Sequence, residues 1–270
     1  MFLWIDVFCR MWYAFFILDR SVNEHMRMRK RHNLGARMER VAELLVEEPE
    51  ALRGRWLAEE PGAEKLYVEL GCGKGRFTVE TAAALSRTLY LAIERVPDAM
   101  ILAMERARER GLKNVRFMDR DAVKLPECFA PGEIDRLYIN FCDPWPKSRD
   151  AKLRLTAPGF LRLYADALKE GGQIHFKTDN TPLFDWSAEQ MEAEGWALSE
   201  LTHDLHGEGP VGVMTDYEAK FYAEGMSINR LVATKTAATK GTAAGPVPRL
   251  RGASLVDARG YEQSAKESEA

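Results

Sequence analysis

Residues 65–75 read KLYVELGCGKG, a short hydrophobic segment that runs directly into a turn with three closely spaced glycines. The segment that follows, GRFTVETAAAL at 75–85, has the apolar spacing of a helix. Glycines between a strand and a helix let the backbone approach a ligand without a Cβ in the way. The stretch therefore predicts a ligand-binding loop near the start of an α/β domain.

The glycine spacing favours one class of ligand. A dinucleotide-binding fingerprint requires a glycine where this chain has Arg76, and the spacing of a phosphate-binding P-loop is absent. What remains is E-x-G-x-G-x-G, with Glu69 two residues before Gly71 and with Gly73 at its centre. This arrangement suits a cationic ligand without phosphate, such as S-adenosylmethionine. The structural alternative is an ordinary tight turn.

Two further acids support a nucleoside-binding site. Glu94 ends the next predicted strand, 88–94, at a position where an acidic side chain can accept both ribose hydroxyls. Asp121 follows the third predicted strand, 114–118, and is expected to contact the adenine. The structural alternative for both residues is a solvated surface carboxylate.

The rest of the chain alternates between strand-like and helix-like segments. Strands are predicted at 65–70, 88–94, 114–118, 134–141, 172–178, from Trp196, and at 227–234. Helices are predicted at 75–85, 97–111, 157–172 and 182–194. This alternation predicts an α/β fold with a mainly parallel central sheet covered by helices on both faces.

A second loop is predicted to carry a catalytic residue. Strand 134–141 runs into CDPWPK at 142–147, so that Asp143 lies at the carboxyl end of a central strand within a proline-stiffened loop. Methylases of exocyclic base amines often place a similar Asp/Asn-Pro-Pro-aromatic run there. Asp143 is therefore expected to face a planar base, and the structural alternative is a proline-rich turn with a packed Trp145.

Composition limits the classes of protein. A chain of 270 residues with 46% hydrophobic and 29% charged residues forms one large α/β domain or two small ones, which excludes fibrous and wholly disordered proteins. Its four cysteines form no CxxC pair and do not cluster with histidines. We therefore expect no disulfide framework and no metal site, and reduced thiols predict a cytoplasmic location.

The net charge of −3 conceals a basic N-terminal segment. Residues 27–40 contain six Arg or Lys against one Glu, which predicts a basic arm that meets a polyanion, although a solvated charged extension is the alternative. An amphipathic helix is predicted from Met38 to Pro49. It links the arm to the domain.

The first 18 residues are apolar except for Asp6 and Arg10. Two central charges disfavour a membrane-spanning helix. The run has no basic segment before it and no small-residue cleavage site after it, so a signal peptide is not expected either. No stable membrane association is therefore expected. An alternative is that natural translation starts at Met26 or Met28.

Five motifs in order resemble those of the bacterial tRNA (guanine-N7)-methyltransferase family across residues 65–233. They are VELGCGKG, AIER, INFCDPWPKSR, IHFKTDN and MTDYEAKF. The resemblance implies a Rossmann-like methyltransferase fold, S-adenosylmethionine as the methyl donor and guanosine 46 of the tRNA variable loop as the target. The methyltransferase domain is accordingly expected at 61–233. Composition alone predicts a hydrophobic extension at 1–25, the basic arm and helix at 26–60 and, because large apolar residues are few, a disordered tail at 234–270.

The resemblance also assigns roles to individual residues. Glu69, Glu94, Asp121 and Asp143, together with Gly71 and Gly73, would line the cofactor site, and Asp143 would be the catalytic residue. The residues that would meet the tRNA are Lys147, Asp179, Thr215, Asp216, Tyr217 and Glu218. Asp150 and Leu153 depart from the longer basic run with a histidine that many members carry there.

Two other functions compete with this reading. A methyltransferase of another RNA or of a small molecule would explain the glycine loop, but not the basic arm combined with the loop around Asp143. A non-catalytic tRNA-binding subunit is disfavoured because Glu69, Glu94 and Asp143 are all present.

Overall fold

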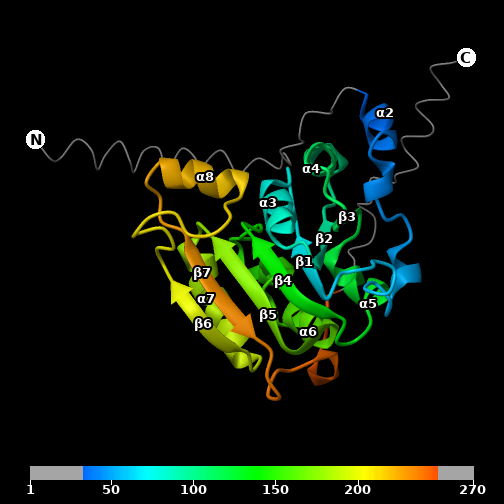
Figure 1. Ribbon diagram of the computed structural model, residues 1–270. Coiled ribbons are helices and arrows are strands. Elements are labelled where there is room, and N and C mark those ends of the chain that lie inside the picture. The colour runs from blue at the N-terminus through cyan, green and yellow to red at the C-terminus, as the bar shows by residue number, and fades with distance from the viewer. Residues whose placement is uncertain (1–32, 249–270) are drawn as a thin grey trace, which may run out of the picture.

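The computed structural model describes residues 33–248, which build one seven-stranded sheet in the order β3-β2-β1-β4-β5-β7-β6 (Figure 1). The strands are β1 (Lys65–Leu70), β2 (Thr88–Ile93), β3 (Val115–Met118), β4 (Ile134–Asn140), β5 (Leu168–Thr178), β6 (Ala197–Thr202) and β7 (Asn229–Thr234). The first five pair in parallel, whereas β7 is antiparallel to both of its neighbours. The predicted α/β fold with a mainly parallel sheet is therefore confirmed.

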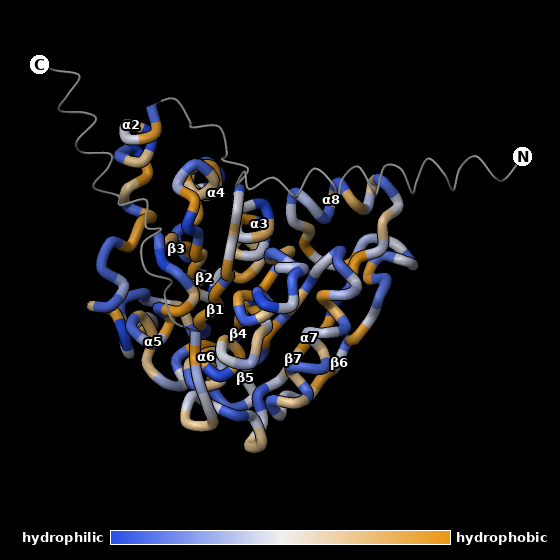
Figure 2. The backbone as a smooth tube through the Cα atoms, turned by 180° about the vertical axis from the view of Figure 1, so that it is seen from behind, coloured by the Kyte–Doolittle hydropathy of each residue, from blue (hydrophilic) through white to orange (hydrophobic). Residues whose placement is uncertain are grey.

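Helices cover both faces of this sheet, as predicted. The described part of the chain contains the helices α2 (Leu34–Glu39), α3 (Arg76–Ala84), α4 (Pro97–Glu109), α5 (Leu125–Cys128), α6 (Pro158–Ala167), α7 (Thr181–Ala193) and α8 (Asp216–Ala223). Successive side chains of a strand point to opposite faces. In β1, Leu66 and Val68 therefore pack with α5, α6 and α7, whereas Tyr67 packs with α3 and α4. In Figure 2 the strands are accordingly among the most hydrophobic parts of the chain.

The strand order reverses next to β1. β2 pairs with one side of β1, and β4 pairs with the other side, so that Tyr67 lies opposite both Tyr90 and Arg136. In open α/β sheets such a reversal forms a crevice at the carboxyl ends of the strands, where ligands bind. The loops after β1 and β4, which carry the glycines and Asp143, both leave the sheet at this point.

The predicted helix from Met38 to Pro49 is wrong. Helix α2 already ends at Glu39, and two short 3₁₀ turns follow at Ala42–Leu44 and Pro49–Leu52. Between these turns, Leu45 forms a β-bridge with Phe117, and the N–H of Val46 donates to the Phe117 carbonyl at 2.9 Å. The segment therefore covers the outer edge of β3, and pairing with an exposed strand edge outweighs the helical pattern.

The boundary between the predicted helix at 157–172 and the strand that follows it also differs from the prediction. Helix α6 ends at Ala167, and β5 begins at Leu168 instead of 172, because Leu168 pairs with Ile134 across a register shift. Residues 169–172, KEGG, therefore belong to the strand, although the sequence assigned them to the end of the helix.

The chain continues in an ordered form beyond β7. The N–H of Lys240 donates to the Glu194 carbonyl at 2.9 Å, and Thr242 Oγ1 donates to Asp166 Oδ2 at 2.5 Å. The prediction of a disordered tail is therefore wrong for residues 235–248, which pack on α6 and α7. The rest of that tail, the hydrophobic extension and residues 27–32 of the basic arm lie outside the described residues. None of the helices within residues 33–248 combines the length and the apolar character that a bilayer crossing requires.

Candidate active site

The three glycines after β1 all have a left-handed backbone, with φ of 76° at Gly71, 54° at Gly73 and 78° at Gly75. A Cβ at Gly75 would lie 2.3 Å from the Cβ of Ala103, so this glycine allows α3 to pack closely on α4. A Cβ at Gly71 or Gly73 would meet no atom of the described residues within 4 Å. These two glycines therefore border open space, where a ligand can approach the backbone.

Glu94 directly contacts the glycine loop. Its Oε2 accepts the N–H of Gly73 at 2.9 Å, and its Oε1 accepts the N–H of Val96 at 2.9 Å. The carbonyl of Ile93 accepts the N–H groups of Gly71 and, at 3.2 Å, Cys72. The structure thus brings together two parts of the predicted cofactor site, and the half-buried carboxylate of Glu94 keeps lone pairs for further donors.

Asp121 lies next along the same edge of the sheet. Its Oδ1 accepts the N–H of Val123 at 3.1 Å, which caps a 3₁₀ turn, and its Oδ2 forms an ion pair with Arg95 at 2.8 Å. Arg95 follows Glu94 directly in sequence, so the ion pair connects the loops after β2 and β3. Glu94 and Asp121 therefore belong to one continuous edge.

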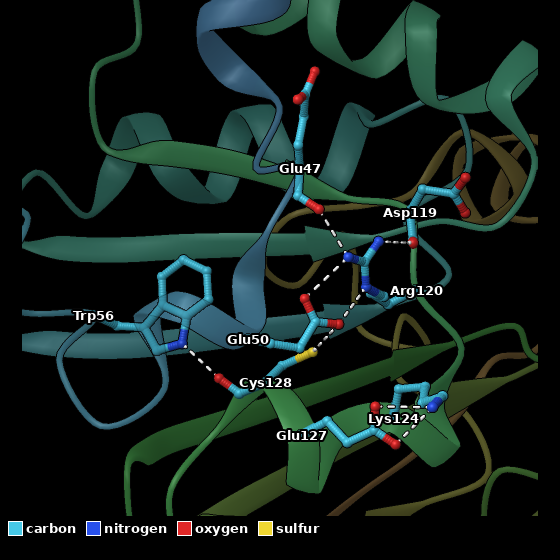
Figure 3. A network of polar contacts seen from close by, with 8 residues as sticks. All are labelled: Glu47, Glu50, Trp56, Asp119, Arg120, Lys124, Glu127 and Cys128. Atoms are coloured by element: carbon cyan, nitrogen blue, oxygen red, sulfur yellow. Dashed lines mark hydrogen bonds and ion pairs between the residues drawn. The ribbon is translucent and has the colours of Figure 1, made fainter. Parts of the chain in front are cut away.

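The segment before β1 supports this edge from outside (Figure 3). Arg120 donates to both carboxylate oxygens of Glu50, at 2.8 and 3.0 Å, and to the Glu47 carbonyl at 2.8 Å. The Arg120 guanidinium holds the pKa of the Glu50 carboxyl below its usual value. Burial raises the pKa of the neighbouring Cys128 thiol to about 12. The N-terminal segment therefore fixes the residue that immediately precedes Asp121.

Glu69 does not face solvent. It is 1% exposed and accepts hydrogen bonds from Thr78 Oγ1 at 2.6 Å, Tyr90 Oη at 3.1 Å and Asn140 Nδ2 at 3.2 Å. Burial raises the pKa of its carboxyl. The Oδ1 atom of Asn140 is buried and has no hydrogen-bond partner among the described residues. Glu69 thus lies beneath the glycine loop and connects β1, β2, α3 and the end of β4.

Asp143 lies in a loop with unusual backbone geometry. Phe141 and Trp145 have φ of 54° and 41°, which is uncommon for residues with a side chain. Arg154 stabilises this conformation by donating to the carbonyls of Pro144 at 2.9 Å and Trp145 at 3.1 Å. Asp143 itself is exposed. The loop therefore presents this carboxylate to solvent at the switch point of the sheet.

Arg154 is a residue whose role in shaping the loop the sequence did not reveal. Its guanidinium lies 4.3 Å from the ring centroid of Trp186 on α7, which holds the side chain between the loop and the helix. Neither the hydrogen bonds to backbone carbonyls nor the contact with a residue 32 positions away leaves a local sequence signal.

The predicted tRNA-contacting residues fall into an exposed and an inaccessible set. Lys147, after Asp143, and Asp179, after β5, are both exposed. Tyr217 is 65% exposed on the first turn of α8, beside the half-exposed Asp216, which pairs with Arg106 at 2.7 Å. Glu218 is 0% exposed and therefore cannot reach a substrate in this conformation.

Thr215 and Glu218 form the N-terminal cap of α8. Thr215 Oγ1 accepts the N–H of Glu218 at 2.9 Å, and Glu218 Oε2 accepts the N–H of Thr215 at 3.1 Å. This reciprocal capping box satisfies two backbone donors at the helix start. The sequence contained the signal, because Thr-x-x-Glu is the capping-box pattern, but the resemblance assigned both residues to the substrate.

Comparison with known proteins shows the family of this chain. Residues 63–231 match the model of a family described as "Putative methyltransferase". A tRNA (guanine-N(7)-)-methyltransferase of Lactococcus lactis subsp. cremoris (strain MG1363) is 41% identical over 211 residues, which are 77% of this chain and 97% of the relative. One of Macrococcus caseolyticus (strain JCSC5402) is 46% identical over 171 residues, which are 63% of this chain and 81% of the relative.

Among solved structures, the 16S rRNA methyltransferase KamB is 16% identical, with a TM-score of 0.49 over 78% of this chain and 96% of that one. The family match covers the strands and loops described above, from before β1 into β7. With the identity to the Lactococcus relative over most of both chains, it shows that this chain belongs to the tRNA (guanine-N7)-methyltransferase family.

Proposed function

We propose that this protein transfers a methyl group from S-adenosylmethionine to N7 of guanosine 46 in the tRNA variable loop, with Asp143 as the catalytic residue. The observation that carries the proposal is the convergence of the glycine loop, Glu94 and the Asp143 loop at the switch point between β1 and β4. The names of the two bacterial relatives support the substrate class.

The residues around the glycine loop fit S-adenosylmethionine. Gly71 and Gly73 border open space, and the carboxylates of Glu94 and Asp121 are acceptors for the ribose hydroxyls and the adenine amine. The unpartnered Oδ1 of Asn140, next to Glu69, fits a site for a donor such as the ammonium group of the same molecule. When bound, S-adenosylmethionine supplies a methyl group on a positively charged sulfur.

The reaction needs orientation more than proton transfer. Guanine N7 has a free lone pair at neutral pH, so no base has to remove a proton before it attacks. Alignment of the two reactants contributes up to about 7–11 kcal/mol in favourable cases. Asp143 accepts the N1–H and N2 amine of guanine, which selects this base and stabilises the positive charge that develops on the ring. Arg154 holds the loop in the conformation that this contact requires.

The remaining exposed residues provide the tRNA surface. Lys147 binds a phosphate, and Asp179 contacts the base from the end of β5. Thr215, Asp216 and Tyr217 meet the tRNA from the start of α8, and the basic arm adds phosphate contacts. We also place the protein in the cytoplasm, because its substrate is tRNA and Cys72, Cys128 and Cys142 are free thiols.

The test combines substrate and enzyme variants. Purified protein is incubated with labelled S-adenosylmethionine and unmodified tRNA transcripts that carry G46 or A46. Borohydride reduction and aniline cleavage then map the 7-methylguanosine. Asp143→Asn removes the charge with little change of volume. Glu170→Gln is the matched control, because Glu170 is an exposed carboxylate near the opposite end of the sheet.

We expect label only with the G46 transcript and cleavage only at position 46. Asp143→Asn should lower kcat at least a hundredfold with an unchanged Tm, and Glu170→Gln should behave as the wild type. Equal labelling of the A46 transcript would refute the target position. Turnover by Asp143→Asn within threefold of the wild type would refute the catalytic assignment.

A further inference from the structure

Three titratable side chains form a buried cluster that is separate from the glycine loop and from the loop of Asp143. Lys177 on β5, His206 in the loop before α8 and Glu218 on α8 are 7%, 6% and 0% exposed. Lys177 Nζ donates to Glu218 Oε2 at 2.6 Å, and His206 Nε2 lies 3.1 Å from Glu218 Oε1. Charged side chains are almost never buried unless they are paired, and here both oxygens of one carboxylate are engaged.

The cluster also fixes the backbone around it. His206 Nδ1 accepts the N–H of Val211 at 3.1 Å, so Nε2 carries the ring proton and donates it to Glu218. Lys177 Nζ donates to the carbonyl of Val213 at 3.1 Å. Glu218 closes the capping box with Thr215. Three backbone positions in the connection between β6 and α8, Val211, Val213 and Thr215, are thereby tied to the end of β5.

Helix α8 in turn borders the catalytic loop. The ring of Phe221 lies 6.1 Å from that of Phe141, two residues before Asp143, and Tyr217 stacks on Phe221 at 6.3 Å. In Figure 1, α8 lies beyond the arrowheads of β4 and β5. The orientation of the exposed Tyr217 relative to Asp143 therefore depends on how the start of α8 is held.

We propose that Glu218 is a positioning residue that, through Lys177 and His206, holds the first turn of α8 in the orientation that binds tRNA, and that Glu218 does not itself contact the tRNA. This inference rests on the proposed function. It differs from the role that the family resemblance assigns to this glutamate. The distinction is carried by the complete burial of the carboxylate and by the engagement of both its oxygens with protein donors.

The physical chemistry of buried ion pairs supports a role in geometry. Desolvation offsets much of the attraction between two buried charges, so the pair adds little net stability, whereas removal of one partner leaves an uncompensated charge. Burial lowers the pKa of Lys177, and the Glu218 carboxylate opposes this shift. The cluster therefore favours one arrangement of the start of α8 over others more than it stabilises the domain.

A double-mutant cycle tests the proposal. The variants are Glu218→Gln, Lys177→Met and the double substitution. Met places an unbranched apolar side chain where Lys177 Nζ lies 4.8 Å from the centroid of the Phe77 ring. The matched control is Glu224→Gln at the C-cap of the same helix, because Glu224 is half exposed and lies 3.8 Å from the exposed Lys220. The measurements are kcat and KM for tRNA and the Kd of S-adenosylmethionine by calorimetry.

We expect each single variant to raise the KM for tRNA at least tenfold, with the Kd of S-adenosylmethionine within twofold of the wild type. The KM of the double variant for tRNA should be no higher than that of the more strongly affected single variant, because both substitutions remove the interaction between Lys177 and Glu218. Glu224→Gln should be unaffected. An unchanged KM for Lys177→Met together with a raised KM for Glu218→Gln would mean direct contact between Glu218 and tRNA, and would overturn the proposal.

Rescue by a conservative variant separates positioning from folding. His206→Gln keeps an N–H donor for Glu218 and should retain a lower KM for tRNA than His206→Ala. If the single variants lower only the amount of active enzyme and leave KM unchanged, the role is merely structural and the proposal fails.

Amide hydrogen exchange of α8 provides a readout without tRNA. We expect faster exchange of residues 216–223 in Lys177→Met and Glu218→Gln than in the wild type, and unchanged exchange would refute the inference. This experiment does not depend on activity. Its failure is therefore distinct from failure of the proposed function, which would appear as the absence of tRNA methylation by the wild-type protein.

Discussion

Alanine substitutions at Gly73 and Gly75 should affect two different properties of the protein, although the residues are two positions apart. Both have a positive φ, 54° and 78°, so either alanine introduces backbone strain. Only at Gly75 does the added Cβ collide, 2.3 Å from the Cβ and 2.6 Å from the Cα of Ala103. At Gly73 the Cβ enters the open space assigned to the cofactor.

The expected magnitudes follow from these contacts. A left-handed conformation costs an alanine about 1–2 kcal/mol. Overpacking adds about 1–3 kcal/mol at Gly75, because α4 has to move away from α3. For a domain of this size, 1 kcal/mol corresponds to roughly 2–4 °C in Tm. Gly75→Ala should therefore lower Tm by roughly 4–20 °C and Gly73→Ala by roughly 2–8 °C.

Cofactor affinity should show the opposite order. The methyl group of Gly73→Ala occupies ligand space and disturbs the Gly73 N–H that donates to Glu94, so we expect the Kd of S-adenosylmethionine to rise at least tenfold, which is about 1.4 kcal/mol. Folded Gly75→Ala should bind within about threefold of the wild type. Scanning calorimetry and titration calorimetry measure the two effects. If Gly73→Ala binds S-adenosylmethionine normally, the open space beside this glycine is not the cofactor site.

Three other perturbations address separate parts of the molecule. Glu94→Ala should weaken S-adenosylmethionine binding by about 1.5–3 kcal/mol in titration calorimetry, because the ribose hydroxyls lose a charged acceptor; an unchanged Kd would exclude this contact. Removal of residues 1–32, which spares the Arg37–Glu105 pair, should lower tRNA affinity and reduce the log–log salt slope by about 0.7–0.9 per lost phosphate contact, with unchanged Tm and cofactor affinity. An unaltered salt slope would make the arm a solvated extension. Because Arg120 lowers the pKa of Glu50, the stability from this pair is present above the unfolded-state pKa and is lost as pH falls through the folded-state pKa. Glu50→Gln should accordingly flatten the acid side of a plot of Tm against pH, and an identical acid limb would contradict this contribution.

The sequence predicted those elements that have a strong hydrophobic pattern and a proline or glycine at their ends. Strand β2 has a continuous hydrophobic run, and α4 opens with Pro97 and is followed by Gly111, so both were recognisable from neighbouring residues alone. The segment after Met38 was misjudged because its apolar residues pack on α4 and β3. A pairing with Phe117, 72 positions away, competes with the helix and leaves no trace in the local pattern.

The same limit applies to the candidate site. Motif spacing located Glu94 and Asp143 at strand ends, because a parallel sheet brings the carboxyl ends of its strands to one edge. It did not distinguish Glu69 and Glu218, which are buried, from the acids that are open to solvent. Burial depends on what packs above a residue: α3 and Tyr90 cover Glu69, and His206 and Lys177 cover Glu218.

This division of the acids has a chemical consequence. A carboxylate that accepts several protein hydrogen bonds, such as that of Glu69, holds elements together, and any reorientation toward a ligand would break those bonds. A carboxylate held in an exposed loop, such as that of Asp143, is free to accept from a base. Methylation of N7 places positive charge on guanine, so the acid nearest the base has to be accessible. We therefore propose that the buried acids fix the geometry and that the exposed acids contact the ligands.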